Sequence, residues 1–89
     1  MRVKLLRSHF EKLPDESGVY FLYQANNILL YIGKAKSIRS RIGDHDREKK
    51  FDYVCFETCH YSRARSLERE LLALYKQEHS QLPFYNKQS

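Results

Sequence analysis

The stretch GVYFLYQANNILLYIGKAKSIRSR, residues 18–41, decides the fold. It begins with two runs rich in aromatic, leucine and β-branched side chains, Val19 to Tyr23 and Ile28 to Ile32, which are typical of β-strands. Between them lies Gln24-Ala25-Asn26-Asn27, whose asparagines tolerate the left-handed backbone of a tight turn. The stretch therefore predicts an antiparallel hairpin.

The predicted hairpin brings two tyrosines to one face. If it closes symmetrically about its turn, Tyr20 lies opposite Tyr31. Gly18 then lies opposite Gly33, and a register shift of two residues still leaves both phenols on one face. By itself this arrangement indicates no more than an ordinary cross-strand pair. The other face carries an apolar set suited to the core: Val19, Phe21, Tyr23, Ile28, Leu30 and Ile32.

A basic helix is predicted directly after the hairpin. Ser37 is a good N-cap for a helix from Ile38 to about Asp46, in which Ile38 and Ile42 point inward. Arg41 and His45 are four residues apart, so they lie on one side of this helix, next to the buried stripe. Arg39 points away from them.

A third strand is predicted from Phe51 to Glu57, because apolar and polar positions alternate there. Cys55 lies in this strand, and Cys59 and His60 follow it. These three side chains leave a zinc-stabilised interaction domain as one alternative, but a zinc site needs a fourth ligand and none is suitably spaced. Reduced, half-buried thiols are the default.

The last long helix contains two carboxylates that helical geometry separates. Glu68 lies inside the apolar arc of this helix, whereas Glu70 falls on its rim. A carboxylate on a buried face costs energy unless it is paired or bound to a metal. The residues alone leave open a salt bridge from Glu68 to Arg41 or Lys34. The arc consists of Ala64, Leu67, Leu71, Leu72, Leu74 and Tyr75.

Size and charge set limits on the class of protein. The 89 residues, 42% of them hydrophobic, form a single domain over 1–89. The net charge of +5 suits a polyanionic partner. The apolar runs are far too short for a membrane span, and the first residues lack the features of a signal peptide. We therefore expect a cytoplasmic protein with no membrane partner.

The motifs together resemble the GIY-YIG endonuclease family, and within it the N-terminal nuclease domain of the excinuclease UvrC. The resemblance covers residues 13–86 and rests on four stretches: Leu13 to Tyr20, Tyr31 to Lys36, Leu67 to Leu72, and Leu82 to Asn86. It implies a compact α/β (α+β) domain of order β-β-α-β-α with a C-terminal extension. Its small, three-stranded and largely antiparallel sheet would be flanked by helices.

The resemblance also assigns site residues. The implied catalytic set is Tyr20, Tyr31, Lys34, Arg41, His45, Glu68 and Asn86, with Glu68 as the metal ligand. The implied DNA-binding residues are Lys34, Lys36, Arg39 and Arg41. Two departures stand out. The stretch from Glu68 to Pro83 is longer than in UvrC, and His45 replaces a tyrosine of UvrC, although other family members have histidine there.

The activity implied is metal-dependent hydrolysis of DNA phosphodiester bonds, in repair or recombination. One Mg²⁺ or Mn²⁺ on Glu68 would assist the leaving oxygen, and Arg41 would neutralise the phosphoryl group. Lys34 and Arg41 would favour a tyrosine phenolate as the base, with Tyr20 and Tyr31 both open for that role. The partners implied are DNA, with RNA left open, and a protein of a repair assembly. The alternative is a non-cleaving DNA- or protein-binding module of the same fold.

Overall fold

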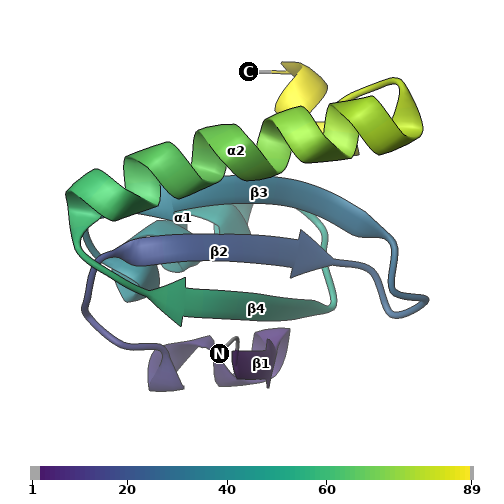
Figure 1. Ribbon diagram of the computed structural model, residues 1–89. Coiled ribbons are helices and arrows are strands. Elements are labelled where there is room, and N and C mark those ends of the chain that lie inside the picture. The colour runs from purple at the N-terminus through teal and green to yellow at the C-terminus, as the bar shows by residue number, and fades with distance from the viewer. Residues whose placement is uncertain (1–2, 89) are drawn as a thin grey trace.

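The computed structural model describes residues 3–88 and has the α+β architecture expected from the sequence. One antiparallel sheet has the strand order β1-β4-β2-β3, with α2 across one face and α1 behind the other (Figure 1). None of the described helices is long and apolar enough to cross a membrane. The elements are β1 (Val3–Leu6), η1 (Arg7–Lys12), β2 (Gly18–Tyr23), β3 (Leu29–Ala35), α1 (Ile38–Glu48), β4 (Tyr53–Thr58), α2 (Tyr61–His79) and η2 (Phe84–Gln88).

The sheet has four strands, so the prediction of three was wrong. The additional strand is β1, which pairs antiparallel with β4 over Val3↔Phe56 to Leu6↔Tyr53. Four residues without a neighbouring turn give little local signal for a strand. The pairing is made with a strand about fifty residues away in the chain, so only tertiary structure creates it.

The predicted hairpin is confirmed, but its register is shifted by two residues from the symmetric one. Tyr20 pairs with Gly33 and Leu22 pairs with Tyr31, so both phenols still share a face. A bulge after Leu22 turns Leu30 onto the phenol face, where it is buried. The placement of Leu30 on the opposite face was therefore wrong, and Ile28 precedes β3 with 49% of its surface exposed.

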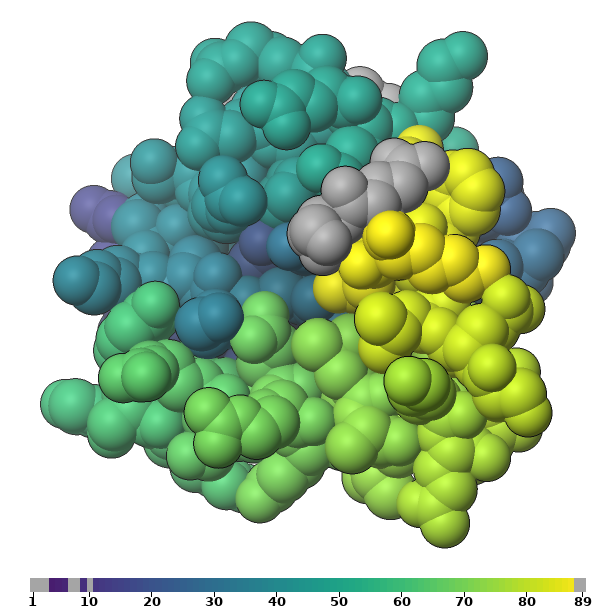
Figure 2. Space-filling model, turned by 90° about the horizontal axis from the view of Figure 1, so that it is seen from above, coloured from purple at the N-terminus to yellow at the C-terminus, as the bar shows by residue number. Residues whose placement is uncertain are grey.

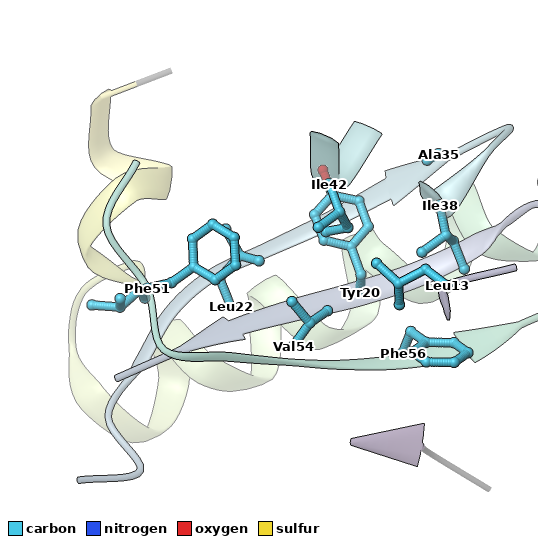
Figure 3. Packing of buried hydrophobic residues seen from close by; sticks show 10 residues of the cluster. Leu13, Tyr20, Leu22, Ala35, Ile38, Ile42, Phe51, Val54 and Phe56 are labelled. Carbon is cyan, nitrogen blue, oxygen red and sulfur yellow. The ribbon is translucent and has the colours of Figure 1, made fainter. Parts of the chain in front are cut away.

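Both faces of the sheet are buried, each against one helix. On the α1 side, Tyr20 and Leu22 pack with Ile38 and Ile42 of the helix (Figure 3). The same cluster takes in Val54 and other residues of β4. On the α2 side, the core consists of Val19, Phe21, Ile32 and Ala64, with partly buried residues of α2 packed around them. Tyr20 is thus a core residue as well as a member of the tyrosine pair.

The first helix begins as predicted. The Ser37 side chain accepts a hydrogen bond from the Ser40 N–H at 3.2 Å, which confirms it as the N-cap. Ile38 and Ile42 are fully buried. The helix runs to Glu48, two residues beyond the expected end, and the Lys49 N–H closes it by donating to the His45 carbonyl at 2.8 Å.

The second helix buries a slightly different arc from the one predicted. Ala64 is fully buried, whereas Leu74 is 54% exposed, so including Leu74 in the buried arc was wrong. At about 100° per residue, Leu74 lies about 80° from Ala64, while Glu68 lies only about 40° away on the other side. The buried face is therefore centred nearer to Glu68 than the leucine pattern indicated.

Candidate active site

The tyrosine pair lies on the α1 face of the sheet. The ring centroids of Tyr20 and Tyr31 are 6.0 Å apart; Tyr20 is fully buried and Tyr31 is half-buried. Gly33 faces Tyr20 across the hairpin, and a Cβ atom there would lie 2.4 Å from the Tyr20 hydroxyl. The absence of a side chain at position 33 is what lets the phenol of Tyr20 lie over β3.

His45 is bonded to the buried phenol. Its Nε2 lies 2.8 Å from the Tyr20 hydroxyl, and its ring centroid is 5.0 Å from that of Tyr31. Burial, together with the charges of Lys49 and Arg41, lowers the pKa of His45 to about 4. The imidazole is therefore neutral near pH 7. Its Nδ1 is buried and has no hydrogen-bond partner among the described residues.

Burial dominates the ionisation of Tyr20. Desolvation and the proximity of Tyr31 raise the pKa of Tyr20 well above its usual value, although Arg41 acts to lower it. On Tyr20, Arg41 acts in the expected direction, but burial outweighs it, and Lys34 faces the other side of the sheet. The Tyr20 hydroxyl is therefore a neutral hydrogen-bonding group at any ordinary pH.

Arg41 projects from α1 toward the tyrosines. Burial acts to lower the pKa of Arg41, but interactions with Tyr20, Tyr31 and Asp44 raise it, so the guanidinium stays charged. About half of its side chain is exposed. By contrast, Arg39 turns the other way, as expected, and its Nε donates to the Leu13 carbonyl at 2.8 Å.

Glu68 is paired with Lys34, one of the two partners considered from the sequence. The Lys34 Nζ lies 3.0 Å from Glu68 Oε1, and the Glu68 side chain is only 18% exposed. The Glu70 side chain is 59% exposed, and its Oε2 lies 3.6 Å from Arg63 Nη1. The two carboxylates thus differ in the way that the helical geometry predicted.

Asn86 binds the backbone of the outermost strand. Its Oδ1 accepts from the Ile32 N–H at 2.9 Å, and its Nδ2 donates to the Ile32 carbonyl at 3.0 Å. Because β3 is an edge strand, these groups have no strand partner on that side. The amide of Asn86 takes the place of that partner and fixes the strand between Tyr31 and Gly33.

Lys49 is a neighbour of the tyrosine pair that the sequence interpretation missed. Its side chain is only 20% exposed, and its Nζ lies 5.5 Å from the Tyr31 ring centroid and 5.7 Å from that of Tyr85. Its charge also contributes to the low pKa of His45. The spacing of four residues from His45 was the available signal, but Lys49 lies beyond the predicted end of the helix.

Other sequence candidates lie apart from the tyrosine pair. Lys36 is exposed, and its Nζ lies 5.5 Å from the Tyr61 ring centroid at the start of α2. Cys55 and Cys59 are half-buried and are not joined in a disulfide. His60 is the N-cap of α2, where its Nδ1 accepts from the Ser62 N–H. Within residues 3–88, no three His, Cys, Asp or Glu side chains are grouped as a metal site would require.

The tyrosine pair on the α1 face and the Lys34–Glu68 pair on the α2 face both lie near one edge of the sheet. Tyr31 points toward α1, whereas Lys34 points toward α2 and Glu68, because successive residues of a strand face opposite sides. Since β3 is the outermost strand, both sets border the same open edge. Figure 2 looks onto this edge and shows a hollow between the teal surface of α1 and the green surface of α2, with blue β3 between them.

The donor set at this edge can accommodate one weakly held divalent cation. Mg²⁺ usually keeps several waters and binds through one or two carboxylates together with substrate phosphates. Glu68 offers one partly exposed carboxylate, and Lys34 occupies only its Oε1 oxygen. The residues present therefore fit a mostly hydrated cation completed by a phosphate, but not a closed protein cage.

Most of the chain matches one known domain family. Residues 16–82 match the family described as the GIY-YIG catalytic domain, and the chain therefore belongs to the GIY-YIG family. UvrABC system protein C of Acaryochloris marina is 42% identical over 43 residues, which cover 48% of this chain and 7% of that protein. UvrABC system protein C of Borrelia duttonii is 48% identical over 40 residues, which cover 45% of this chain and 7% of that protein. The chain thus matches only a small part of the length of these relatives.

A solved structure with the same fold extends the match over most of the chain. It is the GIY-YIG N-terminal endonuclease domain of UvrC from Thermotoga maritima, with a TM-score of 0.69 and 25% sequence identity. The alignment covers 89% of this chain and 92% of that domain. That structure contains magnesium, described as the catalytic divalent cation of that domain. The family resemblance drawn from the motifs is thereby confirmed.

Proposed function

We propose that this chain is a divalent-metal-dependent endonuclease that hydrolyses DNA phosphodiester bonds in DNA repair. The observation that carries the proposal is the convergence at one sheet edge of Tyr31 and Arg41 from one face and Glu68 from the other. Hydrolysis of a phosphodiester needs a base for water, charge stabilisation at the phosphoryl oxygens and help for the leaving oxygen. Each requirement has a candidate residue at this edge.

Tyr31 is our candidate for the general base. It is half-buried, so water can reach it, whereas Tyr20 is fully buried and its raised pKa keeps it protonated. The Arg41 guanidinium interacts with both phenols and would face the negative charge of a Tyr31 phenolate acting as the base. Tyr31 would accept the proton of the attacking water as the oxygen adds to phosphorus. Tyr20 would hydrogen-bond to Tyr31 and hold it in place, itself held by the neutral His45.

Two further groups would act on the phosphate. The Arg41 guanidinium would neutralise charge that develops on the phosphoryl oxygens. Glu68 would hold the Mg²⁺ or Mn²⁺ ion, which when bound supplies Lewis-acid assistance to the departing 3′ oxygen. Asn86 would act on the site through the backbone of Ile32, as a positioning residue.

Binding would rest on basic side chains of β3, of α1 and of the segment between them. Lys34, Lys36, Arg39 and Arg41 are the proposed phosphate contacts, and contacts of this kind position a strand without reading its sequence. DNA is the favoured substrate and RNA a second one to be tested. We further propose a protein partner in a repair assembly and a cytoplasmic location, where the thiols of Cys55 and Cys59 stay reduced.

The test is cleavage of a panel of end-labelled DNA structures and one RNA, with Mg²⁺, Mn²⁺ or EDTA. We expect metal-dependent cleavage, and a loss of about a hundredfold or more in single-turnover rate for Tyr31→Phe with an unchanged melting temperature. Tyr75→Phe on α2, whose ring packs against His79, is the matched control and should cut at the wild-type rate.

Two results would count against the proposal. A wild-type rate for Tyr31→Phe would remove this tyrosine from the chemistry. If the wild-type protein bound DNA but cut nothing with either metal, the non-cleaving binding module of the same fold would be the better account.

A further inference from the structure

The Lys34–Glu68 ion pair occupies the carboxylate to which the proposed function assigns the metal. The Lys34 Nζ bonds Glu68 Oε1 at 3.0 Å, and the two side chains are 34% and 18% exposed. A pair this sheltered from water is screened less than a surface pair. Any cation that binds Glu68 must therefore compete with a lysine that is already in contact with it.

The competition is direct because the site has so few ligands. No group of three metal-binding side chains exists in the described part of the chain, so Glu68 supplies the protein's main attraction for a cation. A divalent ion on Glu68 and an ammonium group on the same carboxylate would repel each other at close range. Binding of either cation to Glu68 therefore weakens the binding of the other.

Lys34 is free to change partner. Its ammonium group lies at the end of a flexible four-carbon chain. Lys34 belongs to β3, the edge strand that borders the hollow between α1 and α2 in Figure 2. A phosphate entering this hollow would offer Lys34 a second anion. The same phosphate would offer the metal the oxygen ligands that the protein lacks.

We propose that Lys34 guards Glu68 against divalent cations until a nucleic-acid phosphate draws it away, so that metal and strand bind cooperatively. This inference rests on the proposed function, because it takes Glu68 as the metal ligand. By linkage, the factor by which the strand tightens metal binding equals the factor by which the metal tightens strand binding. The free protein is then held in a state of low metal affinity.

The first experiment measures Mn²⁺ affinity without nucleic acid, from the electron paramagnetic resonance signal of free Mn²⁺ at constant ionic strength. Lys34→Met should bind Mn²⁺ about fivefold more tightly than wild type, as expected for the loss of one modest ion pair. Lys34→Arg keeps the charge and should stay near wild type. Lys76→Met, which removes an exposed lysine of α2, is the matched control and should also stay near wild type.

The second experiment measures the coupling to nucleic acid. In a Tyr31→Phe background, which is expected to block cleavage, a short DNA duplex should tighten Mn²⁺ binding. The tightening should be severalfold smaller when Lys34→Met is added, because there is no longer a lysine to draw away. Circular dichroism melts of each variant show whether it is folded.

The outcomes separate this inference from the proposed function. Equal Mn²⁺ affinity in wild type and Lys34→Met, or equal tightening by DNA in both backgrounds, would overturn the guarding role and leave the nuclease proposal intact. Glu68→Gln should abolish the measured Mn²⁺ site. If Glu68→Gln bound Mn²⁺ as wild type does, the metal assignment itself would fail, and the inference with it.

Discussion

The phenol of Tyr20 occupies the space above Gly33, its partner across the β2–β3 hairpin. A Cβ atom at position 33 would lie 2.4 Å from the Tyr20 hydroxyl oxygen and 2.7 Å from Tyr31 Cε2. Both contacts are shorter than side chains in folded proteins tolerate. Gly33 therefore leaves room for the ring of Tyr20. The Tyr20 hydroxyl in turn bonds to His45.

Gly33→Ala should therefore displace Tyr20 and disturb its bond to His45. We expect a loss of about 1–3 kcal/mol in the free energy of unfolding, as for other overpacked cores. Urea denaturation measures it. Gly43→Ala is the control: Gly43 lies in α1 with a negative φ, so alanine there should stabilise by about 1 kcal/mol. Equal effects of the two substitutions would contradict the proposed contact.

His45 should make stability depend on pH between about 4 and 6.5. Its pKa is lowered to about 4 in the folded protein from an ordinary value of 6.5, so the unfolded chain binds more protons across this window. Stability should rise with pH through the window, by up to about 3 kcal/mol from this residue. Conversely, the contribution is lost as the pH falls toward 4.

The measurement is the free energy of unfolding from pH 4 to 7.5 for wild type and His45→Gln. The difference between them should grow with pH. His9→Gln, at an exposed position, should keep the wild-type slope. If His45→Gln also kept that slope, His45 would not be held neutral in the core.

Substitution of Glu68 should lower the cleavage rate strongly, whereas substitution of Glu70 should not. Glu68 is 18% exposed and faces Lys34, whereas Glu70 is 59% exposed. Glu68→Gln should lower the single-turnover rate by about a hundredfold or more, because it removes the proposed metal ligand, while DNA binding measured in EDTA should be largely kept. Glu70→Gln should change the rate by less than about twofold. Similar losses in both variants would show that general acidity of α2, not a metal ligand, is what matters.

Asn86 should be needed for its amide and not for charge. Both its Oδ1 and its Nδ2 are used by the Ile32 backbone, so Asn86→Asp replaces a donor with an oxygen that faces the Ile32 carbonyl. We expect Asn86→Asp to be no more stable than Asn86→Ala. Each variant should lose about 1–3 kcal/mol in the free energy of unfolding. Hydrogen exchange at the Ile32 amide should accelerate in both. Wild-type activity and exchange in Asn86→Asp would point instead to an oxygen-ligand role.

Local patterns determined the parts of this protein that depend on near neighbours in the chain. The hairpin followed from two β-prone runs around Gln24 to Asn27, and the start of α1 followed from Ser37. Glu68 stood out because helical geometry placed it inside an apolar arc, and its position in the structure is indeed sheltered. Each of these features needs only contacts within about twenty residues.

Contacts between distant segments decided the rest, because their energies depend on partners that no local pattern identifies. Strand β1 exists through its pairing with β4. Tyr20 has a raised pKa because the sheet and α1 close around it, so that burial outweighs the charge of Arg41. Only the folded chain chose Lys34 over Arg41 as the partner of Glu68 and brought Asn86 to Ile32, since these pairs are 34 and 54 residues apart.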